Sequence, residues 1–276
     1  MTGYAAIVLA GGAARRMGGV DKPARAVGGR SMLHRVLAAV ADADQRIVVG
    51  SSGPVPEGVR TTREEPPGGG PVAATAAGLA LLDSGTTTVA LLAADLPLLT
   101  AAAVTELRRA LDAPVVDRPR DDPPPVRDDP SRVRDDPSRV RDDPSRVRDD
   151  PSRVRDDPPP VRDDLPPALD GPSAGPADAQ TAGRPDVLDG RTPALACWVD
   201  GNGRRQHLCA IWRVPALRAA LDRLAATRGG SLDGAPVRGL LTGLVVREVS
   251  WSGSGPPPWF DCDTDEDVRQ AEEWTR

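Results

Sequence analysis

Residues 4–23 read YAAIVLAGGAARRMGGVDKP, an apolar run that passes directly into a glycine-rich loop. The run Tyr4–Ala10 has the continuous apolar character of a strand that is buried on both faces of a parallel sheet. In the loop, glycines let backbone N–H groups approach a phosphate closely, and successive amides of this kind form an anion-binding concavity. Arg15, Arg16 and Lys22 add positive charge. The stretch therefore predicts a buried parallel strand that ends at a phosphate-binding loop.

The loop matches neither of two common phosphate-binding patterns. No GxxxxGK[ST] loop can be drawn through it, and it lacks the GxGxxG spacing of dinucleotide-binding folds. An ordinary glycine-rich turn after a strand is the alternative that the glycines alone allow. The lysine favours the binding role, because Lys22 is the only lysine among 35 basic residues. An ammonium group on a flexible stem is a point donor that a planar guanidinium cannot replace. The alternative is that a single lysine remains in the chain by chance.

Composition limits the class of protein. The chain has 276 residues and a formal charge of −5, which allows one large domain or two small ones. Its three cysteines, Cys197, Cys209 and Cys262, form no CxxC pair, so we expect neither a disulfide framework nor a structural zinc site. No apolar run approaches the roughly 20 residues that span a bilayer, and the first residues lack the order of a signal peptide. We expect a cytoplasmic protein without a membrane or nucleic-acid partner.

A low-complexity segment occupies residues 117–190. Within it, 120–161 consists of six seven-residue units that read RDDPPPV or RDDPSRV. Proline in every unit excludes a coiled coil, and one valine per unit buries too little apolar surface to offset the entropy of ordering. We therefore expect a disordered, partly polyproline-extended insert between two parts of one domain, 1–116 and 191–276. The insert holds 13 Arg and 19 Asp, so the rest of the chain is close to neutral.

Outside the insert, strand and helix patterns alternate. Three helix starts carry capping residues: Ser31, Thr100 and Thr264, the last with Asp267 in a capping-box pattern. The fold class expected is α/β, a Rossmann-like three-layer sandwich whose mainly parallel sheet has a mixed edge. Ligands of such sheets bind beyond the carboxyl ends of the strands. The expected strands are Tyr4–Ala10, Arg46–Val49, Thr87–Ala93, Ala113–Val116, Ala194–Val199, Leu208–Trp212 and Leu244–Val249, and further expected helices are Pro71–Leu82, Pro215–Ala226 and Thr264–Trp274.

The loop string LAGGAARRMGGVDKP, residues 9–23, resembles the molybdenum cofactor guanylyltransferases, which are nucleotidyltransferases of glycosyltransferase-A-like fold. Three later stretches continue the resemblance in order along the chain: REEPPGGGP at 63–71, LLAADLP at 91–97 and FDCDTDED at 260–267. The resemblance covers most of 1–116 and 194–276. It implies a nucleotide-binding half before the insert and an acceptor-binding half after it.

The resemblance also implies roles for residues of the first half. The nucleotide would be held by the backbone of Leu9, Ala10, Gly11 and Gly12. Lys22 would bind its phosphates, and Arg16 would act with Lys22 at the reacting centre. Glu65 stands where the family has an acidic residue on the nucleotide side of the site. Gly50 stands where the family often has an asparagine that touches the nucleotide, so this chain lacks that side-chain hydrogen bond.

Asp95 resembles the family's magnesium ligand, and its chemistry supports that role independently. A carboxylate just past a buried strand, fixed by Pro97, is rigid and lies at the sheet edge where ligands bind. Mg²⁺ takes one or two protein carboxylates and fills its octahedron with phosphate oxygens and water. Asp261 and Asp263 match a family stretch that also occurs with asparagine. They are candidates for further metal ligands, and a helix-cap cluster before Thr264 is the alternative.

The reaction that the resemblance implies is Mg²⁺-dependent transfer of GMP from GTP to a molybdopterin-type phosphorylated acceptor, with release of pyrophosphate. Transient contact with proteins that make or use the molybdenum cofactor is also implied. Transfer of a cytidylyl group, or transfer to another phosphorylated acceptor, stays open. So does a non-catalytic nucleotide-binding or interaction protein.

The remaining polar and aromatic residues have weaker signals. The segment Arg204–His207 follows a predicted hairpin turn, where it either meets the phosphate of a second substrate or is a solvated hairpin end. His34 falls on an amphipathic helix and is expected to be structural, as are Cys197 and Cys209 in the hairpin strands. Four tryptophans are expected mainly in the core, with one of them free to border a flat pterin: Trp198, Trp212, Trp251 and Trp259.

Overall fold

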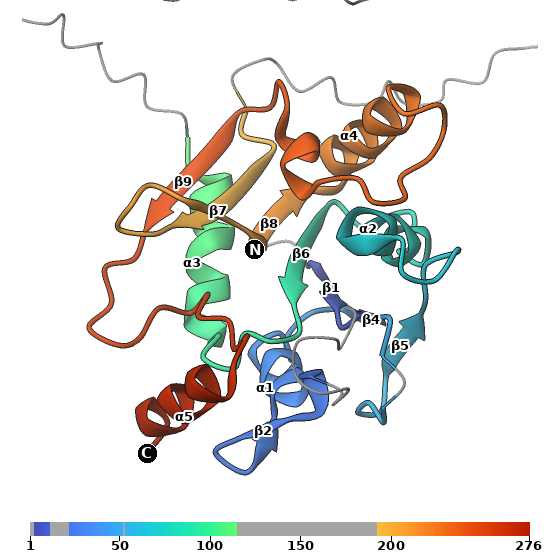
Figure 1. The fold of residues 1–276 in the computed structure, drawn as a ribbon. Coiled ribbons are helices and arrows are strands. Elements are labelled where there is room, and N and C mark those ends of the chain that lie inside the picture. Colours follow the sequence, from blue (N-terminus) through green and yellow to red (C-terminus); the bar gives the residue numbers. More distant parts are fainter. Residues whose placement is uncertain (1–2, 12–21, 52, 115–191) are drawn as a thin grey trace, which may run out of the picture. The chain divides into compact units, whose positions relative to one another are not determined.

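The computed structural model describes residues 3–11, 22–51, 53–114 and 192–276 (Figure 1). These residues form a seven-stranded sheet in the order β5-β4-β1-β6-β8-β7-β9 and a small hairpin of β2 and β3. The strands are β1 (Ala5–Leu9), β2 (Ala26–Val27), β3 (Arg30–Ser31), β4 (Gln45–Val49), β5 (Val59–Thr62), β6 (Thr88–Ala93), β7 (Leu195–Val199), β8 (Arg205–Arg213) and β9 (Val246–Ser250). The helices are α1 (Met32–Ala39), α2 (Gly70–Ala80), α3 (Ala101–Asp112), α4 (Val214–Ala226) and α5 (Asp265–Trp274), with 3₁₀ turns η2 (Lys22–Ala24) and η3 (Val237–Leu241).

The sheet is mainly parallel, as the strand–helix alternation predicts. β1 pairs in parallel with β4 and β6, and β4 pairs in parallel with β5. The chain after residue 192 adds an antiparallel hairpin, because β8 pairs antiparallel with both β6 and β7. β9 then closes the sheet in parallel with β7. Strands from both sides of the insert therefore share one sheet, and the predicted α/β class with a mixed edge is confirmed.

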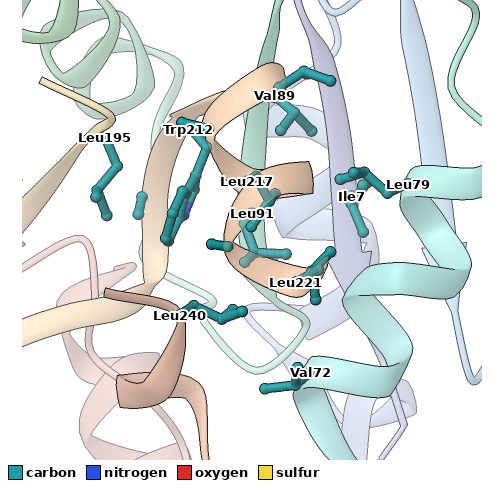
Figure 2. Close-up of a cluster of buried hydrophobic side chains, with 14 of the residues drawn as sticks. Ile7, Val72, Leu79, Val89, Leu91, Leu195, Trp212, Leu217, Leu221 and Leu240 are labelled. Atoms are coloured by element: carbon teal, nitrogen blue, oxygen red, sulfur yellow. The ribbon is translucent and has the colours of Figure 1, made fainter. Parts of the chain in front are cut away.

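One face of the sheet packs against α2 and α4 (Figure 2). β1 supplies alternate residues to this face, so that Ile7 and Leu9 point to it while Val8 points to the other face. Trp212 of β8 is fully buried in the same cluster. Helical residues of this cluster are Val72 and Leu79 of α2 and Leu217 and Leu221 of α4, joined by Leu240 of η3.

The opposite face packs against α1 and α3. Leu33, Val36 and Leu37 of α1 lie in this second cluster. Trp198 of β7 is fully buried there. The sheet is thus the middle of three layers, and its strands are apolar on both faces because both faces are covered.

The capping residues fall where the sequence places them. Ser31, Thr100 and Thr264 each accept a hydrogen bond from a backbone N–H in the first turn of α1, α3 and α5. Thr264 and Asp267 form the full capping box. Pro71 occupies the second rather than the first residue of α2, which begins at Gly70. In the part of the chain that the structure describes, no helix combines the length and apolarity needed to cross a membrane.

Two differences from the expected elements concern strands. The predicted strand Ala113–Val116 is wrong over its described residues, because Ala113 caps the C-terminus of α3 and Pro114 is exposed outside any strand. Residues 115 and 116, like the predicted insert 117–190, lie outside the described residues. Strand β5 was not expected, since its sequence VRTT is short, polar and only partly buried at the sheet edge.

Candidate functional site

The carboxyl ends of β1 and β4 approach each other closely. Ala10 donates its N–H to the carbonyl oxygen of Val49 at 2.8 Å. Gly50 has φ of 89°, and a Cβ placed on it would lie 2.7 Å from the Cα of Gly11. This position therefore requires glycine for two reasons, its backbone conformation and the lack of space. The asparagine that the family often has at this position could not occur here without moving the two strand ends apart.

Lys22 lies between two carboxylates at the same edge of the sheet. Its Nζ donates to Oδ2 of Asp95 at 2.5 Å and to Oδ1 of Asp263 at 2.7 Å. The side chains of Lys22 and Asp95 are 21% and 23% exposed, so this pair is partly screened from water. Burial lowers the pKa of Lys22, but the hydrogen bonds to Asp263 and Asp95 outweigh it and the net pKa is raised. The structure thus brings together three of the residues that the sequence singled out.

Each member of this group is held by local structure. Asp95 follows β6, and the loop after it is fixed because Arg35 of α1 donates its Nε–H to the carbonyl oxygen of Pro97 at 2.7 Å. Cys262 donates its N–H to the carbonyl oxygen of Asp95 at 3.2 Å, which ties the segment before α5 to the end of β6. Arg25 forms an ion pair with Asp265 at the start of α5.

A small apolar cluster supports these contacts. It consists of Val27, Met32, Leu98, Cys262, Val268 and Ala271, with Phe260 packed against it. These residues come from the β2–β3 hairpin, α1, the loop after β6, the segment before α5 and α5 itself. The C-terminal segment is therefore anchored beside Lys22 by buried apolar surface as well as by charge.

Asp95 and Asp263 have the chemistry to hold a divalent cation. Their oxygens already converge on one cationic atom, and Mg²⁺ commonly takes one or two protein carboxylates. Partial burial raises the pKa of Asp261, and the negative charges of Asp263 and Asp95 raise it further. Asp261 therefore lies within electrostatic reach of the pair. Within the described ranges, no group of three or more metal-binding side chains surrounds a common point.

Two adjacent glutamates after β5 have opposite surroundings. Glu65, which the sequence assigned to the nucleotide side, is exposed. Glu64 is only 7% exposed, and its Oε1 accepts the N–H of Gly68 at 3.0 Å. Its Oε2 is buried and has no hydrogen-bond partner. Sequence reasoning missed Glu64, because nothing in two neighbouring residues of the same type tells which one is turned inward.

Other predicted residues are placed as follows. Leu9, Ala10 and Gly11 lie at the carboxyl end of β1. Gly12, Arg15 and Arg16 lie outside the described residues. His34 lies on α1, and Cys197 and Cys209 are buried free thiols on β7 and β8.

The second half of the chain contributes an aromatic cluster and a charged pair. Trp198 packs against Trp251 and Trp259 with ring centroids 5.3 and 5.7 Å apart. Arg205 of β8 forms an ion pair with Glu248 of β9 at 2.7 Å. Burial lowers the pKa of the nearby His207, and the charge of Arg205 lowers it further.

Comparison with known proteins adds sequence evidence to this geometry. Residues 6–130 match the family model of the MobA-like NTP transferase domain. A probable molybdenum cofactor guanylyltransferase from Haloferax mediterranei is 50% identical over 48 residues, which are 17% of this chain and 23% of that protein. The chain aligns with between 22% and 39% of the length of the curated relatives that it matches.

Solved structures share the fold. Molybdopterin-guanine dinucleotide biosynthesis protein A from Archaeoglobus fulgidus has a TM-score of 0.53 at 14% identity, covering 98% of this chain and 97% of that one. The 4-diphosphocytidyl-2C-methyl-D-erythritol synthase from Anaerococcus prevotii also has a TM-score of 0.53, at 12% identity, covering 99% and 96%. The resemblance expected from the sequence is therefore confirmed: residues 6–130 match the model of the MobA-like NTP transferase domain, and the chain is similar to molybdenum cofactor guanylyltransferases.

Proposed function

We propose that this chain transfers GMP from GTP to a molybdopterin-type phosphorylated acceptor and releases pyrophosphate. The observation that carries the proposal is the convergence of Lys22, Asp95 and Asp263 at the carboxyl edge of the sheet. One mobile cation and two carboxylates are the groups that bind a triphosphate and its metal ion. The sequence similarity to molybdenum cofactor guanylyltransferases supports GMP as the group that is transferred.

The residues would divide the work as follows. The backbone at Leu9–Gly11 would lie against the nucleotide, with Gly12 and Arg16 of the glycine loop completing its phosphate contacts. Asp95 and Asp263 would hold Mg²⁺. Asp261 would act on them through its charge alone. When bound there, Mg²⁺ supplies positive charge to the phosphate oxygens.

Lys22 would exchange one set of anionic partners for another. In the described structure it neutralises Asp95 and Asp263. With those carboxylates on the cation, its ammonium group would be free to bind the triphosphate. Its flexible stem allows that change over a short distance.

The transfer step needs little more than alignment and charge neutralisation. A terminal phosphate oxygen of the acceptor would attack the α-phosphorus of GTP, forming a new P–O bond while the bond to the β-phosphate oxygen breaks and pyrophosphate leaves. Because that oxygen is already anionic, no strong general base is required. We include in this proposal a cytoplasmic location and transient contact with proteins that make or use the cofactor.

Cytidylyl transfer is a second candidate. This candidate is favoured by the fold shared with the Anaerococcus prevotii enzyme, which is named as the synthase of a diphosphocytidyl compound. Gly50 leaves the choice of base open, because it lacks the side-chain hydrogen bond to the nucleotide that the family often has at this position. A non-catalytic nucleotide-binding protein is the alternative of another class.

Pyrophosphate release separates these candidates. The full chain is incubated with Mg²⁺ and each of the four nucleoside triphosphates, with and without molybdopterin. We expect release that requires both GTP and the acceptor. Release with CTP instead of GTP would support the cytidylyl alternative, and nucleotide binding without any release would support the non-catalytic one.

A further inference from the structure

A cavity on the α1 side of the sheet takes no part in the proposed transfer step. Its volume is about 380 Å³, which is within the range of small-molecule pockets. The lining combines three nitrogen-bearing side chains with an apolar wall: Arg30, His34, Leu37, Ala38, Arg46 and Pro56. None of these lining residues is acidic. The cavity therefore carries positive charge and has room for a small anion.

Three elements bring the charged side chains to this cavity. Arg46 is the second residue of β4 and shares a face with Val48, which packs on the α1 side of the sheet. His34 lies in the first turn of α1, and Arg30 lies on β3 just before that helix. Gly50 follows the opposite end of β4, where this strand meets the end of β1. The cavity is therefore distinct from the edge that the nucleotide is proposed to occupy.

The donors of the cavity lack acceptors. Within the described ranges, the side chains of Arg30, His34 and Arg46 enter no ion pair or hydrogen bond. Arg60 of the neighbouring strand β5 differs, because it pairs with Asp83. Positive groups that line one cavity repel one another, and a bound anion replaces that repulsion with attraction. The cavity thus has donors and charge that an anionic ligand would satisfy.

The donor set indicates which class of anion fits. A guanidinium group presents a planar fork of N–H donors that matches the oxygens of a phosphate, and an imidazole N–H adds one more donor. A phosphate monoester has three terminal oxygens, enough to accept from all three side chains, whereas a carboxylate has two. The wall formed by Leu37, Ala38 and Pro56 is apolar, so it suits a ligand with an organic part as well as the charged group.

We propose that this cavity binds a small organic phosphate. Its phosphate group lies among the side chains of Arg30, His34 and Arg46, and its apolar part packs against Leu37 and Pro56. The cavity is a binding site in addition to the proposed nucleotide site. The inference goes beyond the proposed transfer of GMP and does not depend on it.

The test titrates phenyl phosphate into the full, isotope-labelled chain and follows the backbone amide shifts by NMR. Divalent cations are omitted, so that the proposed metal-dependent site contributes little. We expect saturable shifts at the amides of Arg30, His34, Ala38 and Arg46, with a Kd of roughly 1 mM or tighter. Inorganic phosphate lacks the apolar part and should bind about fivefold or more weakly. Phenol, which lacks the charge, should cause no saturable shift.

Two variants and a control locate the binding. Arg46→Gln removes a charge and a fork of donors, so the affinity for phenyl phosphate should fall about tenfold or more. Arg30→Gln changes an exposed side chain without a partner, so it provides a second variant if Arg46→Gln does not fold. Arg238→Gln makes the same change at an exposed arginine of η3, which packs on the opposite face of the sheet, and should leave the affinity unchanged.

Three results would overturn the proposal. The first is no saturable shift up to about 10 mM phenyl phosphate. The second is a set of shifts confined to the surroundings of Lys22 and Asp95, and the third is an unchanged affinity in the folded arginine variants of the cavity. Equal affinity for inorganic phosphate would remove the organic part of the ligand. Pyrophosphate release is measured separately, so each of these results leaves the proposed function standing.

Discussion

The two carboxylate positions at the carboxyl edge of the sheet differ in how their charge is satisfied. Asp95 and Asp263 share the ammonium group of Lys22, and all three side chains are partly exposed. Glu64 is buried and has one oxygen without a partner. The first position carries its own counter-ion, which a metal ion and a triphosphate can replace. The second contains an acceptor that only an incoming donor completes. The same edge of the sheet thus carries a carboxylate pair whose charge is balanced within the chain and a buried carboxylate with an unfilled acceptor oxygen.

The largest effect is expected from a change to Asp95, the carboxylate that is proposed to hold Mg²⁺. Asp95→Asn should leave the fold intact but abolish Mg²⁺-dependent turnover, losing roughly 3 kcal/mol or more of transition-state stabilisation. Steady-state kinetics and thermal unfolding measure the two effects. Asp265→Asn is the control, because Asp265 pairs with Arg25 rather than with Lys22. Near-normal turnover of a well-folded Asp95→Asn protein would remove Asp95 from the site.

A second change tests whether the counter-ion must be a lysine. Lys22→Arg keeps the charge but replaces a compact ammonium with a planar guanidinium, so kcat/KM for GTP should fall roughly tenfold to a hundredfold. Kinetics over a range of GTP concentrations measure the loss. If the arginine variant turns over GTP normally, the single lysine of the chain is an accident of composition.

A third change acts on the backbone at Gly50, where the carboxyl ends of β1 and β4 approach each other. Gly50→Ala places a Cβ 2.7 Å from the Cα of Gly11 at a φ of 89°. We expect a loss of about 1–3 kcal/mol in the free energy of unfolding, measured by urea denaturation. Gly58→Ala is the matched control, since Gly58 also has positive φ but its nearest neighbour would be 4.0 Å away. Equal losses in both variants would mean that the close approach of β1 and β4 contributes nothing.

The smallest effect concerns His207, on the hairpin half of the sheet. Burial and the charge of Arg205 lower the pKa of His207 below 6.5 in the folded chain. As the pH falls, the imidazole is therefore protonated in the unfolded chain before it is protonated in the folded chain. Stability should therefore fall as the pH drops below about 6.5 and continue to fall until the folded-state pKa is passed. Urea unfolding of wild type and His207→Gln at pH 8, 6 and 5 measures how the free energy of unfolding changes with pH. The variant should lose slightly less stability on acidification, and identical pH dependence would contradict the shift.

The sequence predicted the fold well because its signals were local. Alternating strands and helices, the caps Ser31, Thr100 and Thr264, and the continuous apolar runs each follow from neighbouring residues. The strand expected at Ala113–Val116 failed at its described residues, Ala113 and Pro114, because a short apolar run cannot be told from a helix end by periodicity alone. The edge strand β5 was missed for the opposite reason, since VRTT pairs on one side only and remains partly polar.

The candidate site was predicted in part. Lys22 and Asp95 were both predicted, and the parallel pairing of β1 with β6 brings the ends of these two strands to one edge of the sheet. Asp263 reaches them only through the packing of α5 and the apolar cluster around Cys262, which no local pattern encodes. The difference between Glu64 and Glu65 depends on how the loop after β5 turns, and sequence alone does not give that direction.

The pairing of β6 with β8 has a consequence for the chain as it is made. β6 ends at Ala93 and its partner begins at Arg205, more than a hundred residues later. At the usual pace of about 5–20 residues per second, β6 emerges from the ribosome on the order of ten seconds before the strand that covers its open edge. During that interval an apolar strand with unpaired N–H and C=O groups is available to other chains. A nascent-chain chaperone that covers this edge should therefore raise the yield of folded protein.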